Sequence, residues 1–93
     1  MAATYQHYID GEWTDGSGTE TFTSENPATG ETLGEFQRGT PEDVDRAVAA
    51  AEDAYEEWRE LSRIDRAEYL WDVYHELKSN VDEYGEIVTR ECG

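Results

Sequence analysis

The hydrophobic pattern of this sequence changes its period once, at Thr40, and this change limits the fold more than any other feature. Before Thr40, polar and apolar residues alternate over short runs typical of partly exposed strands; after it, apolar residues recur at helical spacing. Strands followed by helices predict an α+β arrangement. With 93 residues, the chain can form at most one small domain with a modest core, too little for separate cofactor and substrate domains.

Residues 40–43, Thr-Pro-Glu-Asp, predict the start of the first helix. The threonine hydroxyl can cap a free backbone N–H, proline suits the first helical position, and acids favour the first turn. We expect the acids at 42 and 43, like those further along, to lie on the solvated helix face. The following apolar residues span an arc of roughly 120° at 100° per residue, which predicts one apolar face. These residues are Val44, Ala47, Val48, Ala51, Tyr55 and Trp58.

Two further helices are predicted after residue 61. Ser62 caps the second, and Asp65, three residues later, completes a capping-box arrangement. A break near residues 79–80 precedes a short third helix carrying Tyr84, Ile87 and Val88. Because nothing caps this last helix and no linker precedes Gly93, we expect the sequence to continue beyond it. The apolar stripe of the second helix is formed by Ile64, Ala67, Leu70, Trp71, Tyr74 and Leu77.

The first 39 residues predict an antiparallel sheet of three or four short strands. Residues 8–13 place an Asp-Gly pair between two strand-forming runs, which is a strong hairpin signal because tight primed turns need positive φ. Strands are also predicted at 19–25 and 32–36, joined by the turn at 26–30, where Asn and Pro begin the turn and Gly ends it.

The charge balance excludes several classes of partner. With 23 acidic and 7 basic residues, the net charge is −16, which argues against binding nucleic acid or an anionic membrane. The acids are spread through apolar-striped segments, so they indicate a solvated surface adapted to high salt rather than a functional acidic patch. A single cysteine fits a reducing cytoplasm. Neither a secretory signal nor a run of about 20 apolar residues is found.

The residues that could carry chemistry all have a simpler structural interpretation. Cys92 lacks a nearby histidine in sequence, and His75 has only Asp72 and Glu76 as co-ligands, so we expect an incidental cysteine and a partly buried packing histidine. His7, at the mouth of the hairpin, carries no motif. No glycine-rich strand–turn–helix motif, serine triad or sheltered carboxylate pair is found. Chemistry alone therefore names no reaction.

Several motifs, in order, resemble the aldehyde dehydrogenase superfamily. Residues 8–13, Tyr-Ile-Asp-Gly-Glu-Trp, are similar to its opening hairpin, and Phe22 with residues 26–31, Asn-Pro-Ala-Thr-Gly-Glu, to its Asn-Pro-x-Thr-Gly-Glu turn. Residues 42–51 resemble its first long helix, and Trp58 and Arg66 the region of its second. Residues 89–93, Thr-Arg-Glu-Cys-Gly, resemble a stretch that the family usually continues as Gly-Lys-Pro or similar. The match runs from Tyr5 onward.

This resemblance implies an α/β enzyme of several hundred residues that oxidises a small-molecule aldehyde to a carboxylic acid with NAD or NADP. Residues 1–93 would form the N-terminal part of its cofactor-binding domain, with a β-hairpin region at 1–39 and a helical region at 40–93. The family's catalytic cysteine and glutamate lie downstream, so no catalytic or cofactor-binding residue carries over. The implied partners are the remainder of the chain and, as a homodimer or homotetramer, further copies of it. Residues 69–72, Tyr-Leu-Trp-Asp, favour a semialdehyde.

The resemblance also implies one lesser site and leaves two alternative functions. Many family members hold a monovalent cation, potassium or sodium, through a hydroxyl, the next residue's carbonyl and a later acid, here Ser24, Glu25 and Glu91. Glu91 would otherwise simply cap or solvate a helix end. One alternative is a small acidic interaction module, in which a helical hairpin presents Trp58 and Trp71 to a partner. The other is a soluble acidic protein that reuses the family's N-terminal part in regulation.

Overall fold

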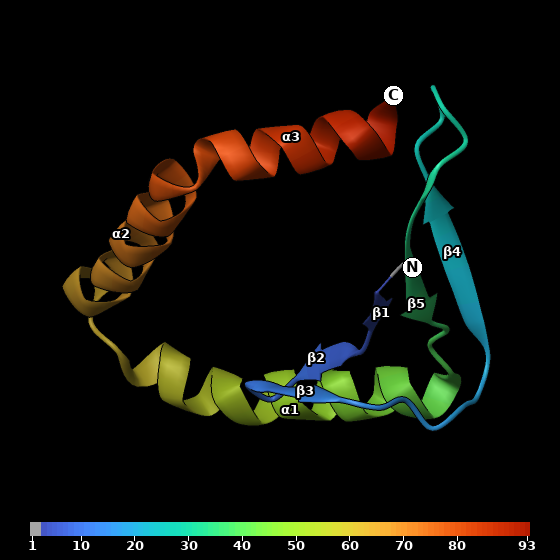
Figure 1. The fold of residues 1–93 in the computed structure, drawn as a ribbon. Helices are drawn as coiled ribbons and strands as arrows, with labels where there is room; N and C mark the ends of the chain where they lie inside the picture. Colours follow the sequence, from blue (N-terminus) through green and yellow to red (C-terminus); the bar gives the residue numbers. More distant parts are fainter. Residues whose placement is uncertain (1–2) are drawn as a thin grey trace.

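The computed structural model describes residues 3–93, in which five strands precede three helices (Figure 1). This order confirms the predicted change of structure at Thr40. The strands are β1 (Thr4–Tyr5), β2 (His7–Ile9), β3 (Glu12–Thr14), β4 (Thr21–Glu25) and β5 (Thr32–Gln37), and the helices are α1 (Pro41–Glu60), α2 (Arg63–Ser79) and α3 (Val81–Cys92).

The predicted hairpin is formed by β2 and β3. Asp10 and Gly11 both have positive φ, 54° and 77°, as a tight primed turn requires. The strands pair with His7 opposite Thr14, and the Tyr8 and Trp13 rings lie 5.0 Å apart between centroids. The turn therefore sets a register that brings His7 to the base of the hairpin.

The prediction of a single antiparallel sheet is wrong. The hairpin stands apart, while β1, β5 and β4 form a second sheet in that order, with β1 parallel to β5. The rings of Tyr5, Phe36 and Phe22 line up across its three strands, with centroid separations of 5.1 and 5.7 Å. Gly34 makes room for this row, because a Cβ there would lie 2.8 Å from Cε2 of Tyr5. The short β1 run carries no signal that could have indicated this long-range pairing.

Local capping explains where the helices begin. Thr40 and Asp43 form a reciprocal capping box at α1, with Pro41 at the first helical position. At α2, the Ser62 side chain accepts the Asp65 N–H, but the Asp65 side chain returns no bond, so only half of the predicted box forms. Asn80 lies between α2 and α3, at the predicted break.

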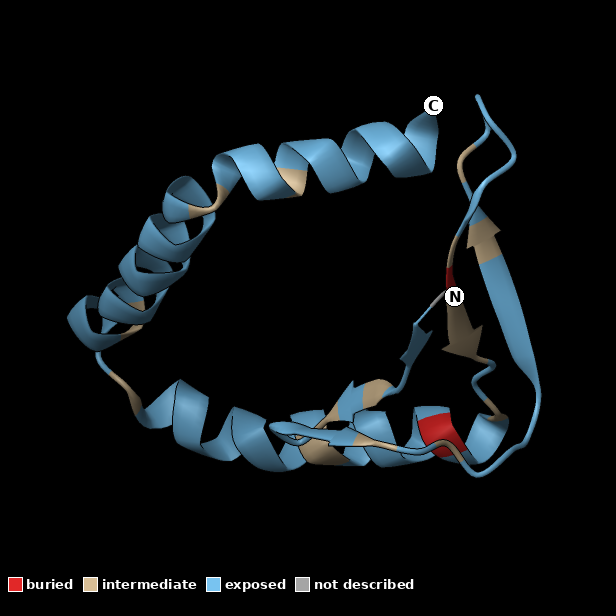
Figure 2. Ribbon diagram, in the orientation of Figure 1, coloured by how far each residue is buried: buried red, intermediate tan, exposed pale blue. Residues whose placement is uncertain are grey.

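The elements are arranged in an open ring (Figure 1), with extents of 47 × 34 × 17 Å. Its radius of gyration is 16.8 Å, whereas a compact domain of this length would have about 12 Å. Within residues 3–93 no hydrophobic side chain is buried, and nearly the whole ribbon is exposed (Figure 2). The expected modest core is therefore wrong, because the helical apolar faces have no layer packed on them. None of the helices in the described part is long and apolar enough to cross a membrane.

Candidate cation site and the cluster around Asp43

The strand end that carries Ser24 and Glu25 is irregular. Ser24 pairs with Gly34 and Glu25 with Thr32, so Leu33 is an extra residue in β5 and the register shifts between Ser24 and Glu25. Such a bulge bends a strand and leaves a backbone group outside the regular ladder. The Glu25 carbonyl, predicted as a cation ligand, therefore lies beside a local break in the sheet.

Glu91 reaches the same region from the other end of the chain. It lies in the last turn of α3, which contacts β4, and a Cβ added at Gly93 would lie 3.3 Å from Cβ of Pro27 in the turn after β4. The Glu91 side chain also lines a cavity of about 270 Å³ together with Tyr5, Leu33, Phe36, Ile87 and Arg90. The structure thus brings the three predicted ligand positions to neighbouring elements.

The chemistry of this group suits a hard ion rather than a transition metal. Hydroxyl, carbonyl and carboxylate oxygens are ligands for hard cations, whereas transition metals favour imidazole and thiolate. Among residues 3–93, no three His, Cys, Asp or Glu side chains gather closely enough to hold a metal ion. A cation here would depend on the Ser24 hydroxyl and the Glu25 backbone oxygen as well as on Glu91.

Cys92 and His75 both lie on exposed surface. Cys92 is in the last turn of α3, and its side chain forms no hydrogen bond or ion pair within the described residues. His75 was expected to be partly buried, but it is exposed on α2, where its ring lies against those of Trp71 and Tyr74. His75 is exposed for the same reason that the core is missing, because no other element of residues 3–93 covers that side of α2.

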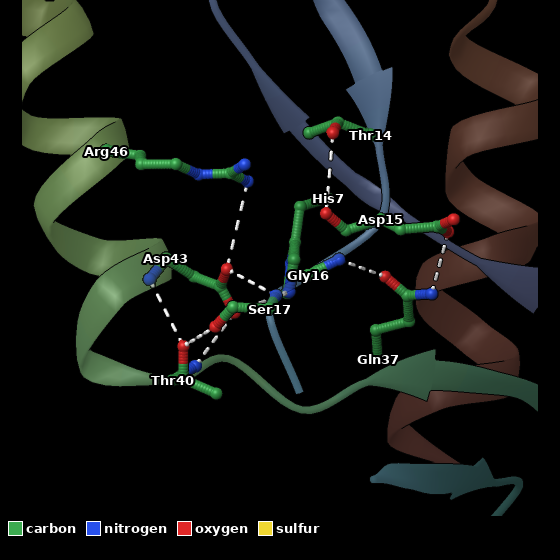
Figure 3. Close-up of polar contacts among 9 residues, drawn as sticks. All are labelled: His7, Thr14, Asp15, Gly16, Ser17, Gln37, Thr40, Asp43 and Arg46. Atoms are coloured by element: carbon green, nitrogen blue, oxygen red, sulfur yellow. Dashed lines mark hydrogen bonds and ion pairs between the residues drawn. The ribbon is translucent and has the colours of Figure 1, made fainter. Parts of the chain in front are cut away.

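Asp43 contradicts its predicted place on the solvated face of α1. Its side chain is only 4% exposed. Oδ1 accepts the Ser17 N–H at 2.9 Å, and Oδ2 accepts the Thr40 N–H at 3.0 Å (Figure 3). These two bonds, the Ser17 N–H first, hold the pKa of Asp43 at about 2, with smaller help from the Thr40 side chain and His7. One carboxylate therefore joins the loop after β3 to the start of α1.

The hairpin reaches the same carboxylate through His7. Nε2 of His7 lies 3.6 Å from Oδ2 of Asp43, and Arg46 approaches Oδ1 from the other side at 3.8 Å (Figure 3). Gly16 is required between them, because a Cβ there would lie 2.8 Å from Nε2 of His7 and 2.9 Å from Oδ2 of Asp43. The side chains of His7 and Asp43 are thus packed closely against the backbone of Gly16.

Asp15 extends the cluster to the sheet. Its Oδ1 accepts the side-chain amides of Gln6 at 2.8 Å and Gln37 at 3.0 Å, and these two bonds, Gln6 first, lower the pKa of Asp15. Gln37 in turn accepts the Gly16 N–H at 2.8 Å (Figure 3). Residues 15–17 are therefore held by both β5 and α1.

These contacts position backbone and supply no reactive group. The sequence patterns did not predict this cluster, although the Thr40-x-x-Asp43 spacing follows the capping-box pattern. His7 carried no comparable signal, because its contact with Asp43 joins residues 36 positions apart in the chain. We name His7, Asp15, Gly16, Ser17, Gln37, Thr40, Asp43 and Arg46 the Asp43 cluster.

Comparison with known proteins now defines the class of protein. Residues 13–93 match the aldehyde dehydrogenase family. The chain is 41% identical over 88 residues to malonate-semialdehyde dehydrogenase 1 of Geobacillus kaustophilus, covering 95% of this chain and 18% of that protein. It is 37% identical over 86 residues to the D-glyceraldehyde dehydrogenase (NADP⁺) of Picrophilus torridus, covering 92% and 17% respectively.

Solved structures have the same arrangement of elements. An aldehyde dehydrogenase from Bartonella henselae superposes with a TM-score of 0.92 at 22% identity, over 97% of this chain and 19% of that one. A proposed methylmalonate-semialdehyde dehydrogenase from Sinorhizobium meliloti 1021, complexed with NAD, superposes with a TM-score of 0.89 at 30% identity, over 98% and 18%. The corresponding parts of these much longer solved chains therefore have the same open-ring shape.

The chain belongs to the aldehyde dehydrogenase family. It corresponds to an N-terminal segment of that α/β fold, as the order of its motifs predicted. It spans less than a fifth of the length of these relatives.

Proposed function

We propose that this chain is the N-terminal part of an NAD(P)-dependent aldehyde dehydrogenase that oxidises a semialdehyde to a carboxylic acid. The observation that carries the proposal is the 41% identity over 88 residues with a malonate-semialdehyde dehydrogenase. The NADP⁺-dependent relative and the NAD complex of the S. meliloti structure support the choice of cofactor class. The nicotinamide cofactor would accept the hydride lost by the aldehyde.

Within this enzyme, residues 1–93 would act as a structural part of the cofactor-binding domain, with a β-hairpin region at 1–39 and a helical region at 40–93. The exposed apolar faces of α1, α2 and α3 support this role, since the remainder of the enzyme would cover them. We further propose a cytoplasmic homodimer or homotetramer in a salt-adapted organism. The net charge of −16 supports the salt adaptation, and the single cysteine supports a reducing compartment.

Activity of the whole protein tests the proposed function. With malonate semialdehyde, methylmalonate semialdehyde and D-glyceraldehyde as substrates, we expect NAD or NADP to be reduced, with the highest kcat/KM for a semialdehyde. In the same assay, the 93-residue chain should reduce neither cofactor, and calorimetry at millimolar NAD should show no saturable heat. A whole protein that oxidises none of these aldehydes would contradict the proposal.

Of the two alternatives, the small acidic interaction module has one supporting observation. Trp58 and Trp71 are both exposed, Trp71 at 59%. The coding frame after Gly93 separates the two functions. A continuation resembling Gly-Lys-Pro, followed later by a glycine-rich motif and a cysteine, supports the dehydrogenase, and an early stop codon supports the module.

We also propose that Ser24, Glu25 and Glu91 hold a potassium or sodium ion. The bulge beside Glu25, the contact of α3 with β4 and the all-oxygen ligand set support the site. Such an ion would join the end of β4 to the end of α3, which are far apart in sequence. Its function would be to stabilise this junction rather than to take part in the chemical step.

Glu91→Gln in the whole protein should weaken the dependence of stability on the cation. The change removes one ligand charge while keeping the size of the side chain, so the thermal midpoint should differ less between potassium, sodium and choline chloride at equal ionic strength. Glu83→Gln, an exposed change on the same helix, is the matched control and should retain the wild-type preference. Identical preferences in wild type and Glu91→Gln would exclude the site.

A further inference from the structure

The Asp43 cluster contains one buried polar atom whose bonding is incomplete. Nε2 of His7 is buried and has no hydrogen-bond partner, although Oδ2 of Asp43 lies 3.6 Å away. An N–H···O bond normally measures 2.7–3.2 Å, so this contact is about half an ångström too long. Leaving a buried polar atom unpaired costs free energy. A small movement of the hairpin toward α1 would complete the bond.

The surroundings of His7 restrict how that bond can form. A side chain at position 16 would collide with both Nε2 and Oδ2, so Gly16 keeps the space beside the two partners free of a side chain of its own. The side chain of His7 is 22% exposed, so the ring can exchange protons with solvent. A proton on Nε2 attracts the carboxylate, whereas a lone pair on Nε2 repels it.

We propose that His7 is a pH-responsive latch that fastens the β2–β3 hairpin to the start of α1. When the ring takes up a proton from solvent, both ring nitrogens carry hydrogen, and Nε2 donates to Oδ2 of the ionised Asp43. When the ring loses that proton, the ion pair is lost and the neutral ring can also adopt the tautomer with a lone pair on Nε2. The latch is therefore tighter on the acid side of the range in which imidazoles titrate, about pH 5 to 8.

The other charged groups around His7 are carboxylates and a guanidinium group. On α1 these are Asp43 and Arg46, and in the loop after β3 the nearest is Asp15. Carboxylates and guanidinium groups ordinarily titrate outside pH 5 to 8. The interface between the hairpin and α1 further along is also lined by charged side chains, those of Asp10, Glu12 and Asp53. Among residues 3–93, His7 is therefore the group whose change of charge would alter the docking.

Hydrogen exchange in the whole protein tests the latch, because the Ser17 N–H is itself bonded to Asp43. Exchange of a peptide covering residues 15–18 is compared at about pH 5.5 and about pH 8, either side of the imidazole range, after correction for intrinsic exchange rates. In the wild type, protection should be severalfold higher at the lower pH. Near-ultraviolet circular dichroism confirms that each variant is folded.

Three variants separate the latch from simple packing. His7→Gln places a non-titrating amide donor near Nε2, so protection should persist but lose its pH dependence. His7→Phe keeps a ring without a donor, so protection should fall at both pH values. His75→Gln removes the other histidine of residues 1–93, which is exposed on α2, and should behave as wild type. Three outcomes would each overturn the proposal. They are protection that does not depend on pH in the wild type, protection that still depends on pH in His7→Phe, and protection that no longer depends on pH in His75→Gln.

Discussion

The isolated 93-residue chain is expected to gain helix severalfold between dilute buffer and molar potassium chloride. Its net charge of −16 crowds like charges on every helix. The Debye length falls from about 30 Å at ~0.01 M salt to about 3 Å at ~1 M, so molar salt removes most of this repulsion. Because no hydrophobic side chain is buried within residues 3–93, the folded chain should also associate through its apolar faces.

Circular dichroism across a salt series, combined with light scattering, measures both effects. Sucrose at matched osmolality is the control, because it strengthens apolar burial without screening charge. If sucrose restored as much helix as potassium chloride, charge repulsion would not be the cause of the low helix content in dilute buffer. A chain that is folded, monomeric and indifferent to salt would contradict both the salt adaptation and the need for covering layers.

Asp43→Asn should destabilise the chain, although it removes one charge from a strongly acidic protein. The amide retains one acceptor oxygen but directs an NH₂ group at either the Ser17 or the Thr40 N–H, so a carboxylate bond is replaced by a contact between donors. Glu42→Gln removes the same charge from an exposed neighbour and is the matched control. In molar potassium chloride, we expect the thermal midpoint of helix loss to fall by several degrees for Asp43→Asn and to change little for Glu42→Gln.

The same variant has a defined pH signature. The pKa of Asp43 is about 2 in the folded chain, below the value of about 3.9 for an unfolded aspartate. A lowered carboxylate pKa contributes stability that is present above the unfolded value and is lost as pH falls through the folded one. The difference between wild type and Asp43→Asn should therefore shrink as pH falls below about 5 and be largely lost by about pH 2. An undiminished difference at pH 2 would show that the carboxylate charge is not the cause.

Prediction from sequence succeeded where the signal was local. The Asp-Gly pair at residues 10–11 requires the positive φ values that it has, and Thr40 and Pro41 favour the helix start that they form. Both features involve residues within four positions of one another. The family was predicted from short motifs and their order, and the match over residues 13–93 confirms this prediction. The cation site stays a prediction, although its residues lie on neighbouring elements.

The sequence by itself determined the hairpin, the helices and their capping residues, because backbone conformation responds to nearby side chains through short-range sterics and hydrogen bonds. Only the tertiary structure decided that β1 runs parallel to β5, that Asp43 is buried and that His7 lies against it. Each of these contacts joins segments whose separation in sequence is too large for a local pattern to record. The apolar stripes of the helices show the same contrast between local sequence and tertiary structure. Their periodicity marked one side of α1 for burial, but whether a layer covers that side depends on atoms beyond the helix itself.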